Sequence, residues 1–321
     1  MALLIAEHEV DSLLNMAAAM EVVEEAFKLQ GEGSALNLPR RRVSGGHSTV
    51  HIMGGALPGL DLIGIKAYVT GPTGVRFVVN LYRESTGEPL AIIEADRLGQ
   101  LRTGAASGVS AKYLAREDAQ IVGVFGSGRQ ARTQLQAVAA ARKLAMARVF
   151  SRDAEHRRAF GREMSVLLGI NVAPTADPEQ VAREADVIIT ATSSAEPVLK
   201  GEWIRPGTHV IAMGANRMTA RELDDVAMES FDLIAVDDIE QSKLESLDLA
   251  APIERGAFGW EDLVHLGDVA AGKVPGRLDV RHKTLFKSLG IGLWDVAVAG
   301  RVYQAARARG LGTEIPMFAA R

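Results

Sequence analysis

The chain has 321 residues, 47% of them hydrophobic, and its 36 basic and 40 acidic residues give a net charge of −4. This length and core content are typical of a globular protein with two domains. The charge argues against general attraction to nucleic acid or membranes, and no apolar run is long enough to span a bilayer. The absence of cysteine excludes thiolate and disulfide chemistry, and the scattered histidines predict no metal site. Because no signal peptide is evident, we expect a cytoplasmic protein.

The first third of the chain predicts a small α+β domain. Residues 9–29 have the apolar spacing of an amphipathic helix, which Gly31 and Gly33 would end. Short β-like runs separated by glycine and proline clusters follow over residues 42–44, 49–53, 63–69, 77–82 and 90–94. A hairpin turn is expected at 85–88, and a helix over about 99–116 leads into the next domain.

The most informative motif is the apolar run 121–125 followed by Gly126-Ser127-Gly128-Arg129-Gln130-Ala131. A buried strand, a glycine turn and the start of a helix together form a site for a pyrophosphate. Gly126 permits the tight turn, Gly128 lets backbone N–H groups approach the phosphates, and the helix start adds unpaired donors. The motif therefore predicts a dinucleotide site.

Further alternation supports a Rossmann-type, doubly wound parallel sheet in an α/β protein. Buried strands are expected at 147–151, 185–192, 209–214 and 231–237, with helices between them. Ligands of such sheets bind at the carboxyl ends of the strands, so Thr192, Met213 and Gly214 are expected near the nicotinamide. We expect a dinucleotide-binding domain over 116–292 and a substrate-binding and dimerisation domain over 1–115 plus 293–321. The latter includes a returning helix at 293–308.

The end of the second Rossmann strand indicates which dinucleotide is preferred. Enzymes that prefer NAD usually carry an acidic residue there, whereas this chain has Ser151 and Arg152. A hydroxyl and a guanidinium suit the 2′-phosphate of NADP(H). Asp153 follows directly, so NAD(H) stays possible, and Arg152 as an ordinary solvated side chain is the alternative. We expect NADP(H) to be preferred.

With these residues in view, the chain resembles the ornithine cyclodeaminase/mu-crystallin family nearly end to end. The motifs that carry the resemblance are the stretches 64–70 around Lys66, 101–107 with Arg102 and Thr103, 126–131, 201–207, 221–224 and 284–290. The resemblance implies a homodimer that acts with a nicotinamide cofactor on small 2-amino or 2-imino acids. It also implies cofactor contacts in the matching motifs, at Thr103, Gly126, Gly128, Arg129, Gln130, Ser288 and Gly290.

For the substrate, the resemblance implies that Lys66 and Arg102 hold the carboxylate beside the nicotinamide. An ammonium and a guanidinium suit a planar carboxylate, and burial in an apolar strand would lower the pKa of Lys66 for proton exchange. The family's further substrate arginine follows a proline, here Pro39. Counting from the proline favours Arg41, and strand alternation towards Met53 favours Arg42, so both stay open.

One position departs from the cyclodeaminase pattern. Where that pattern has an acidic residue, this chain has Asn216, which can hydrogen-bond a substrate nitrogen or a water but cannot act as a general base; a turn residue is the alternative reading. We therefore expect hydride transfer to a 2-imino acid, most simply a cyclic ketimine such as pyrroline- or piperideine-2-carboxylate. Alanine dehydrogenation, ornithine cyclodeamination and non-catalytic NADPH binding are the alternatives.

Overall fold

The computed structural model describes residues 1–317, and the chain divides into two compact units. Unit 1 comprises Met1–Arg102 together with the segment from Ile291 onward, and unit 2 comprises Thr103–Gly290. We expected a boundary after residue 115, where a helix ends. The division instead falls inside that helix, α3 (Asp96–Leu114). The last four residues of the predicted 293–321 segment lie outside the described residues.

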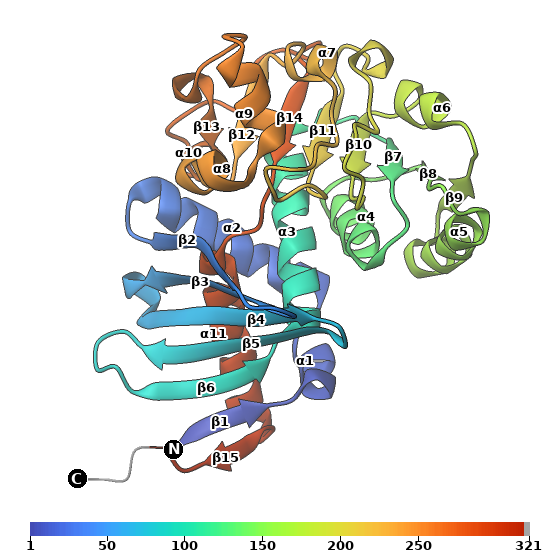
Figure 1. Cartoon of the computed structure of the whole chain (residues 1–321). Helices are drawn as coiled ribbons and strands as arrows, with labels where there is room; N and C mark the ends of the chain where they lie inside the picture. The colour runs from blue at the N-terminus through green and yellow to red at the C-terminus, as the bar shows by residue number, and fades with distance from the viewer. Residues whose placement is uncertain (318–321) are drawn as a thin grey trace. The chain divides into compact units, whose positions relative to one another are not determined.

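Unit 1 is built on a seven-stranded sheet with the order β15-β1-β6-β5-β4-β3-β2. Strands β2 to β6 form a meander in which each strand pairs antiparallel with the next, as Figure 1 shows. β1 then pairs parallel with β6 and antiparallel with β15. The strands are β1 (Ala2–Ile5), β2 (Leu36–Ser44), β3 (Thr49–Leu57), β4 (Leu62–Gly71), β5 (Gly74–Arg83), β6 (Pro89–Glu94) and β15 (Thr313–Ile315).

Helix α11 (Gly292–Arg309) packs across β3 and β4 and against α2 (Met16–Glu32). The single helix predicted over residues 9–29 is wrong, because α1 (Glu7–Leu13) ends before α2 begins. The break lies at Asn15, whose side chain accepts a hydrogen bond from the Ala18 amide and so caps α2. A short 3₁₀ turn, η1 (Pro58–Leu60), links β3 to β4.

Unit 2 contains an eight-stranded sheet with the order β13-β12-β14-β11-β10-β7-β8-β9, in which each described pairing is parallel. The four residues of β10, of β11 and of β14 are all buried, as runs covered by helices on both faces should be. The strands are β7 (Ile121–Phe125), β8 (Met146–Phe150), β9 (Asn171–Pro174), β10 (Val187–Thr190), β11 (His209–Ala212), β12 (Leu233–Val236), β13 (Val264–His265) and β14 (Thr284–Lys287).

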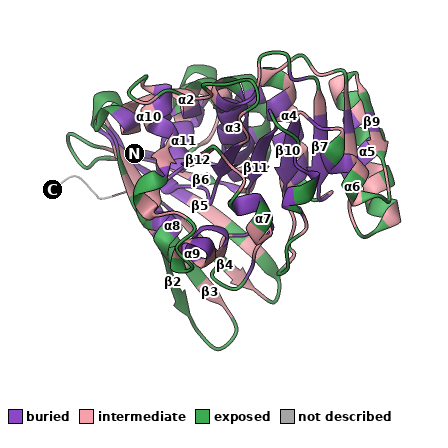
Figure 2. Ribbon diagram, turned by 90° about the horizontal axis from the view of Figure 1, so that it is seen from above, coloured by how far each residue is buried: buried purple, intermediate pink, exposed green. Residues whose placement is uncertain are grey.

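The helices of unit 2 keep polar residues outward. In Figure 2 β7, β10 and β11 are buried while α5 and α6 show exposed positions. The elements are α4 (Arg129–Ala141), α5 (Ala154–Leu168), α6 (Pro178–Arg183), η2 (Gly201–Trp203), α7 (Asp225–Met228), α8 (Ile239–Glu245), α9 (Leu247–Glu254), η3 (Trp260–Asp262) and α10 (Leu266–Ala270).

The predicted fold class is confirmed. A parallel sheet with intervening helices forms unit 2, and a largely antiparallel sheet with helices forms unit 1. Within residues 1–317, each helix is too short or too polar to cross a bilayer.

Candidate active site

Glycines in the sheet of unit 1 let the start of α11 approach unusually closely. A β-carbon at Gly55 of β3 would lie 2.6 Å from Leu293 Cα, and one at Gly64 of β4 would lie 3.3 Å from a methyl of Val296. At Gly292, a β-carbon would meet the backbone of Gly54 at 2.3 Å. Since larger side chains would hold the helix away from the strands, these glycines fix the first turn of α11 against the sheet.

Lys66 lies on the face of β4 that α11 covers. Alternation along the strand buries Leu62, Gly64 and Lys66 and turns Ile63 and Ile65 outward. Across the sheet Lys66 pairs with Met53 on one side and Val79 on the other, both fully buried. Its own exposure is 2%, so the predicted burial of this lysine is confirmed.

Arg102 and Lys66 converge on one carboxylate, that of Asp295 in the first turn of α11. Lys66 Nζ donates to Asp295 Oδ1 over 2.8 Å, and Arg102 Nε donates to the same oxygen over 3.0 Å. The Asp295 side chain is fully buried, and those of Lys66 and Arg102 are 3% and 7% exposed. Such a cluster is stable only where each buried charge has a partner.

Burial lowers the pKa of Lys66 to about 8, from an ordinary value of 10.5. The attraction of Asp295 opposes this effect, and the positive charges of Arg102 and Arg40 add to it. An ammonium with a pKa near neutral pH can both bind an anion and exchange a proton.

The arginine that joins this cluster is Arg40, not Arg41 or Arg42. The side chain of Arg40 is 5% exposed, whereas Arg41 and Arg42 are exposed. Between Leu38 and Arg41 the pairing of β2 with β3 shifts register, which places Arg42 opposite His51 and Arg41 opposite Ile52. Arg40 and Arg42 both lower the pKa of His51, to about 4, but burial of the ring is the larger cause.

In unit 2, the glycine motif adopts the geometry of a phosphate-binding turn. Gly126 has φ 110°, a conformation that favours glycine, and a β-carbon there would lie 2.4 Å from Ala191 O. Gly128 caps α4, and within residues 1–317 no atom lies within 4 Å of where its β-carbon would be. The turn therefore leaves open space at the start of α4, where backbone N–H groups at a helix start suit an anion.

A cavity of about 490 Å³ opens at this turn, beside the carboxyl ends of β7, β8 and β10. It is lined by the predicted cofactor residues Gly126, Gly128, Arg129, Gln130, Ser151, Arg152 and Thr192. Five further predicted residues do not line it: Thr103, Met213, Gly214, Ser288 and Gly290. The cavity and the open turn fit the pyrophosphate and adenosine portion of a dinucleotide.

Arg152 brings a positive charge to the end of this cavity that would hold the adenosine. Arg152 and His156 both line it and are exposed, and Arg157 is held nearby by a hydrogen bond to Ser151 O. Asp153 also lines the cavity, and one oxygen of its carboxylate caps α5 by accepting from the His156 amide over 2.8 Å. Ser151 accepts from the Ser127 hydroxyl over 3.0 Å.

Two buried carboxylates, which the sequence did not identify, organise the strand ends of unit 2. Glu222 accepts hydrogen bonds from the Thr190 hydroxyl, from the amide and hydroxyl of Thr192, and from the Gly214 amide over 2.6 Å. It thereby ties two of the predicted nicotinamide-side residues together. The motif 221–224 was part of the family resemblance, but nothing in it indicated this role.

Asp237 holds the segment after β14 in place with hydrogen bonds, as Glu222 does for the segments after β10 and β11. Its Oδ2 accepts from the Ser288 hydroxyl and from the amides of Leu289 and Gly290. Burial raises the pKa of Asp237 to about 6. Ser288 and Gly290 therefore both donate hydrogen bonds to the Asp237 carboxylate.

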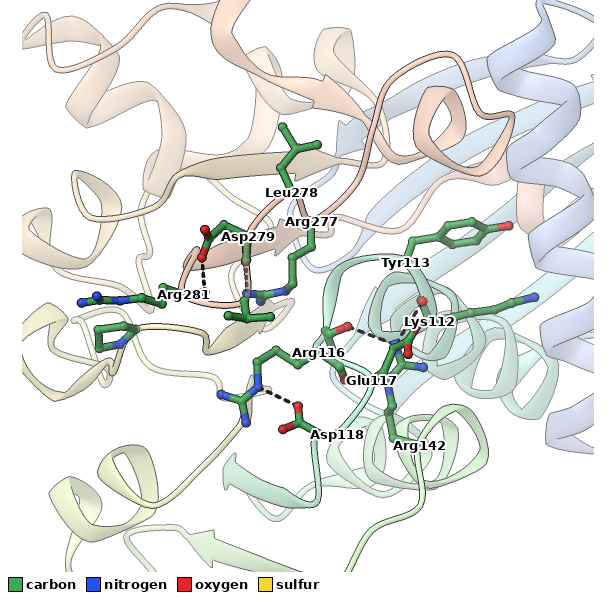
Figure 3. A pocket seen from close by; sticks show the side chains of 13 residues that line it. Lys112, Tyr113, Arg116, Glu117, Asp118, Arg142, Arg277, Leu278, Asp279 and Arg281 are labelled. Atoms are coloured by element: carbon green, nitrogen blue, oxygen red, sulfur yellow. Dashed lines mark hydrogen bonds and ion pairs between the residues drawn. The ribbon is translucent and has the colours of Figure 1, made fainter.

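A larger cavity, of about 760 Å³, lies at the opposite, amino ends of the strands (Figure 3). Two of its arginines hydrogen-bond the end of α3: Arg142 donates to the carbonyls of Lys112, Ala115 and Arg116, and Arg277 donates to Leu114 O. Arg116 is paired with Asp118 and Asp186. Arg142 and Arg277 thus cap the end of α3, and Arg116 is held in ion pairs. We therefore do not take this cavity as the candidate active site.

Several solved structures share this fold over nearly the whole chain. The chain is 33% identical to Δ1-pyrroline-2-carboxylate reductase of Thermococcus litoralis, solved with NADH and L-proline, with a TM-score of 0.93 over 98% of this chain and 100% of that one. It is 33% identical to an archaeal alanine dehydrogenase dimer with bound NAD, with a TM-score of 0.92 over 99% of each chain. It is also 30% identical to iminosuccinate reductase of Paracoccus denitrificans in complex with NAD⁺, with a TM-score of 0.93 over 98% of this chain and 99% of that one. The family model for ornithine cyclodeaminase/mu-crystallin proteins matches residues 2–310. The chain belongs to the ornithine cyclodeaminase/mu-crystallin family.

Proposed function

We propose that this protein is an NAD(P)H-dependent reductase of small 2-imino acids, with cyclic ketimine carboxylates such as pyrroline-2-carboxylate as the first substrates to test. The observation that carries the proposal is the convergence of Lys66 and Arg102 in one buried cluster, with Arg40 close by. Three cations with one carboxylate leave a net positive site that suits a small carboxylic acid. Relatives named as pyrroline-2-carboxylate and iminosuccinate reductases support this substrate class.

A nicotinamide dinucleotide, when bound, supplies a hydride to the imine carbon, and a proton is needed on the nitrogen to complete the amine. In this proposal Arg102 and Arg40 hold the substrate carboxylate, and Lys66 keeps the imine nitrogen protonated. A lysine with a pKa of about 8 is suited to this role near neutral pH. Orientation by the cations would supply much of the acceleration, on the order of 7–11 kcal/mol.

We propose NADP(H) as the preferred cofactor and NAD(H) as an alternative. Arg152 and His156 line the adenosine end of the cavity, where Asp153 also lies with one carboxylate oxygen engaged as a helix cap. These features favour a 2′-phosphate over a bare ribose. The solved relatives contain NADH, NAD or NAD⁺, so a comparison of the two Kd values is the direct test.

We also propose a homodimer that forms through unit 1, in the cytoplasm. The outward face of its sheet carries exposed apolar side chains, among them Leu36, Leu38, Ile52, Ile63 and Ile65. An apolar surface of this kind is typical of a protein interface, and one archaeal relative is described as a dimer. Sedimentation velocity would distinguish the dimer from a monomer.

Alanine dehydrogenase activity is the second candidate, because an archaeal alanine dehydrogenase is among the similar structures. Cyclodeamination is disfavoured by Asn216, which offers no carboxylate as a base. The test is oxidation of NADPH and NADH with pyrroline-2-carboxylate, piperideine-2-carboxylate, and pyruvate plus ammonia. Turnover of the cyclic imines supports the proposal. Turnover of pyruvate plus ammonia alone would replace it with alanine dehydrogenation, and cofactor binding without turnover would leave only a binding protein.

A further inference from the structure

Asp295 hydrogen-bonds both expected substrate cations directly. Its Oδ1 lies 2.8 Å from Lys66 Nζ and 3.0 Å from Arg102 Nε. It stands in the first turn of α11, where the partial positive charge of a helix start favours a carboxylate. The close approach of Gly55 and Gly64 to this helix fixes where that carboxylate lies.

Three charged groups act on Lys66, and its neighbours on β3 and β5, Met53 and Val79, are apolar. Arg40 of β2 and Arg102 of α3 are positive, and Asp295 of α11 is the negative group that acts on it. The Phe77 ring of β5 lies 5.1 Å from Nζ. The cluster therefore has a net charge of +2 when Lys66 is protonated, and it would have +3 without Asp295.

Part of this cluster is left without a partner. Arg102 uses Nε for Asp295, while its Nη1 is buried and has no hydrogen-bond partner among residues 1–317. A buried, unpaired guanidinium nitrogen is costly unless a ligand completes it. With Nε fixed by Asp295, Nη1 remains as a donor for an incoming carboxylate.

We propose that Asp295 is a positioning residue: it orients Arg102 for the substrate carboxylate and holds Lys66, charged in a buried site, for the imine nitrogen. The proposal rests on the proposed function for the identity of the ligand, but its electrostatic part concerns the protein alone. Asp295 acts through the two cations and need not touch the substrate.

The test is Asp295→Asn, which keeps a carbonyl oxygen at the same place and removes the charge. Asp11→Asn is the matched control, since Asp11 pairs with Arg97 on the surface of the same unit. The titration of Lys66 is followed by NMR in protein labelled at lysine Cε, with Lys66→Met to assign the signal. We expect the pKa of Lys66 to fall by at least one unit in Asp295→Asn and to stay unchanged in the control. An unchanged pKa in Asp295→Asn would overturn the proposal.

A second readout uses kinetics with pyrroline-2-carboxylate. We expect KM to rise at least tenfold in Asp295→Asn, and the alkaline limb of the kcat/KM profile to move to lower pH by the same shift as the NMR titration. A residue that only stabilised the fold would change neither the alkaline limb of the kcat/KM profile nor the pKa of Lys66. If the wild type reduces no imino acid but Lys66 still titrates as expected, the proposed function fails and the electrostatic role of Asp295 stands.

Asp295→Asn could fail to fold, because it removes the anion that Lys66 and Arg102 share. The double variant Lys66→Met/Asp295→Asn restores the net charge of +2. Recovery of folding in the double variant, seen as a higher Tm than that of Asp295→Asn, supports the charge coupling. A double variant as unstable as Asp295→Asn would contradict it.

Discussion

Gly99 of α3 lies directly beside the ammonium group of Lys66: a β-carbon at residue 99 would be 2.8 Å from Lys66 Nζ. Arg102 follows one helical turn later, so both residues lie on the same face of α3. The helix therefore supplies one cation to the cluster and leaves room for the other. This explains a glycine in a helix interior, where it is otherwise unfavourable.

We expect Gly99→Ala to displace the ammonium of Lys66 while the protein stays folded, because alanine is the better helix former and the displaced atom ends a flexible chain. A shift of about 1 Å in a positioned group can cost on the order of 100-fold in rate. We therefore expect kcat/KM for the imino acid to fall at least tenfold. Gly59→Ala is the control, since no atom lies within 4 Å of its β-carbon position among the described residues. Equal activity of the two variants would contradict this role for Gly99.

The depressed pKa of Lys66 makes folding stability depend on pH. An unfolded lysine titrates near 10.5 and the folded one near 8, so the unfolded state binds more protons between these values. The free energy of unfolding should therefore gain a rising contribution from pH 8 to pH 10.5, at most about 3 kcal/mol. Lys66→Met should lack this rise in urea titrations made across that range. If the free energy of unfolding changed with pH in the same way for both proteins, burial would not lower the pKa of Lys66.

Gly126 and Gly128 should respond differently to alanine. Gly126→Ala places a side chain at φ 110° and against Ala191 O, so we expect a loss of stability of roughly 1–3 kcal/mol, seen as a lower Tm. Gly128→Ala is unstrained and meets open space, so Tm should stay near that of the wild type while dinucleotide affinity falls tenfold or more. Unaltered cofactor binding by Gly128→Ala would place the phosphates elsewhere.

Arg152→Ala should weaken NADPH selectively. Loss of one guanidinium contact to a phosphate costs roughly 1–3 kcal/mol, so we expect Kd for NADPH to rise about tenfold and Kd for NADH to stay within twofold. Arg158→Ala is the control, because Arg158, in the helix that follows Arg152, pairs with Glu155 and does not line the cavity. Equal losses for both cofactors would argue against a 2′-phosphate at Arg152.

Local patterns predicted most of the fold. The β-like runs at 63–69 and 77–82 became β4 and β5, and the glycine motif follows β7 as expected. The break at Asn15 was missed, since apolar spacing continues across it and only the cap reveals the new helix. β1 and β14 were also missed as strands; in β14 the buried Lys287, paired with Asp248, interrupts the apolar pattern.

The candidate site was harder to predict, because it joins residues far apart in the chain. Lys66 and Arg102 were found from their motifs, but Asp295 comes about 190 residues later and no local spacing connects it to them. The sequence feature that could have pointed to Asp295 is an acidic residue among apolar neighbours, in the stretch Trp294–Ala299. Similarly, the register shift in β2 that buries Arg40 cannot be derived from alternation alone.

The most direct test of the central claim is the fate of the transferred hydrogen. The wild type is incubated with pyrroline-2-carboxylate and NADPH carrying deuterium at both C4 positions of the nicotinamide, and the product is analysed by mass spectrometry and NMR. We expect proline with one deuterium at Cα, formed much more slowly by Lys66→Met. Unlabelled proline, or no proline while pyruvate and ammonia yield labelled alanine, would contradict it.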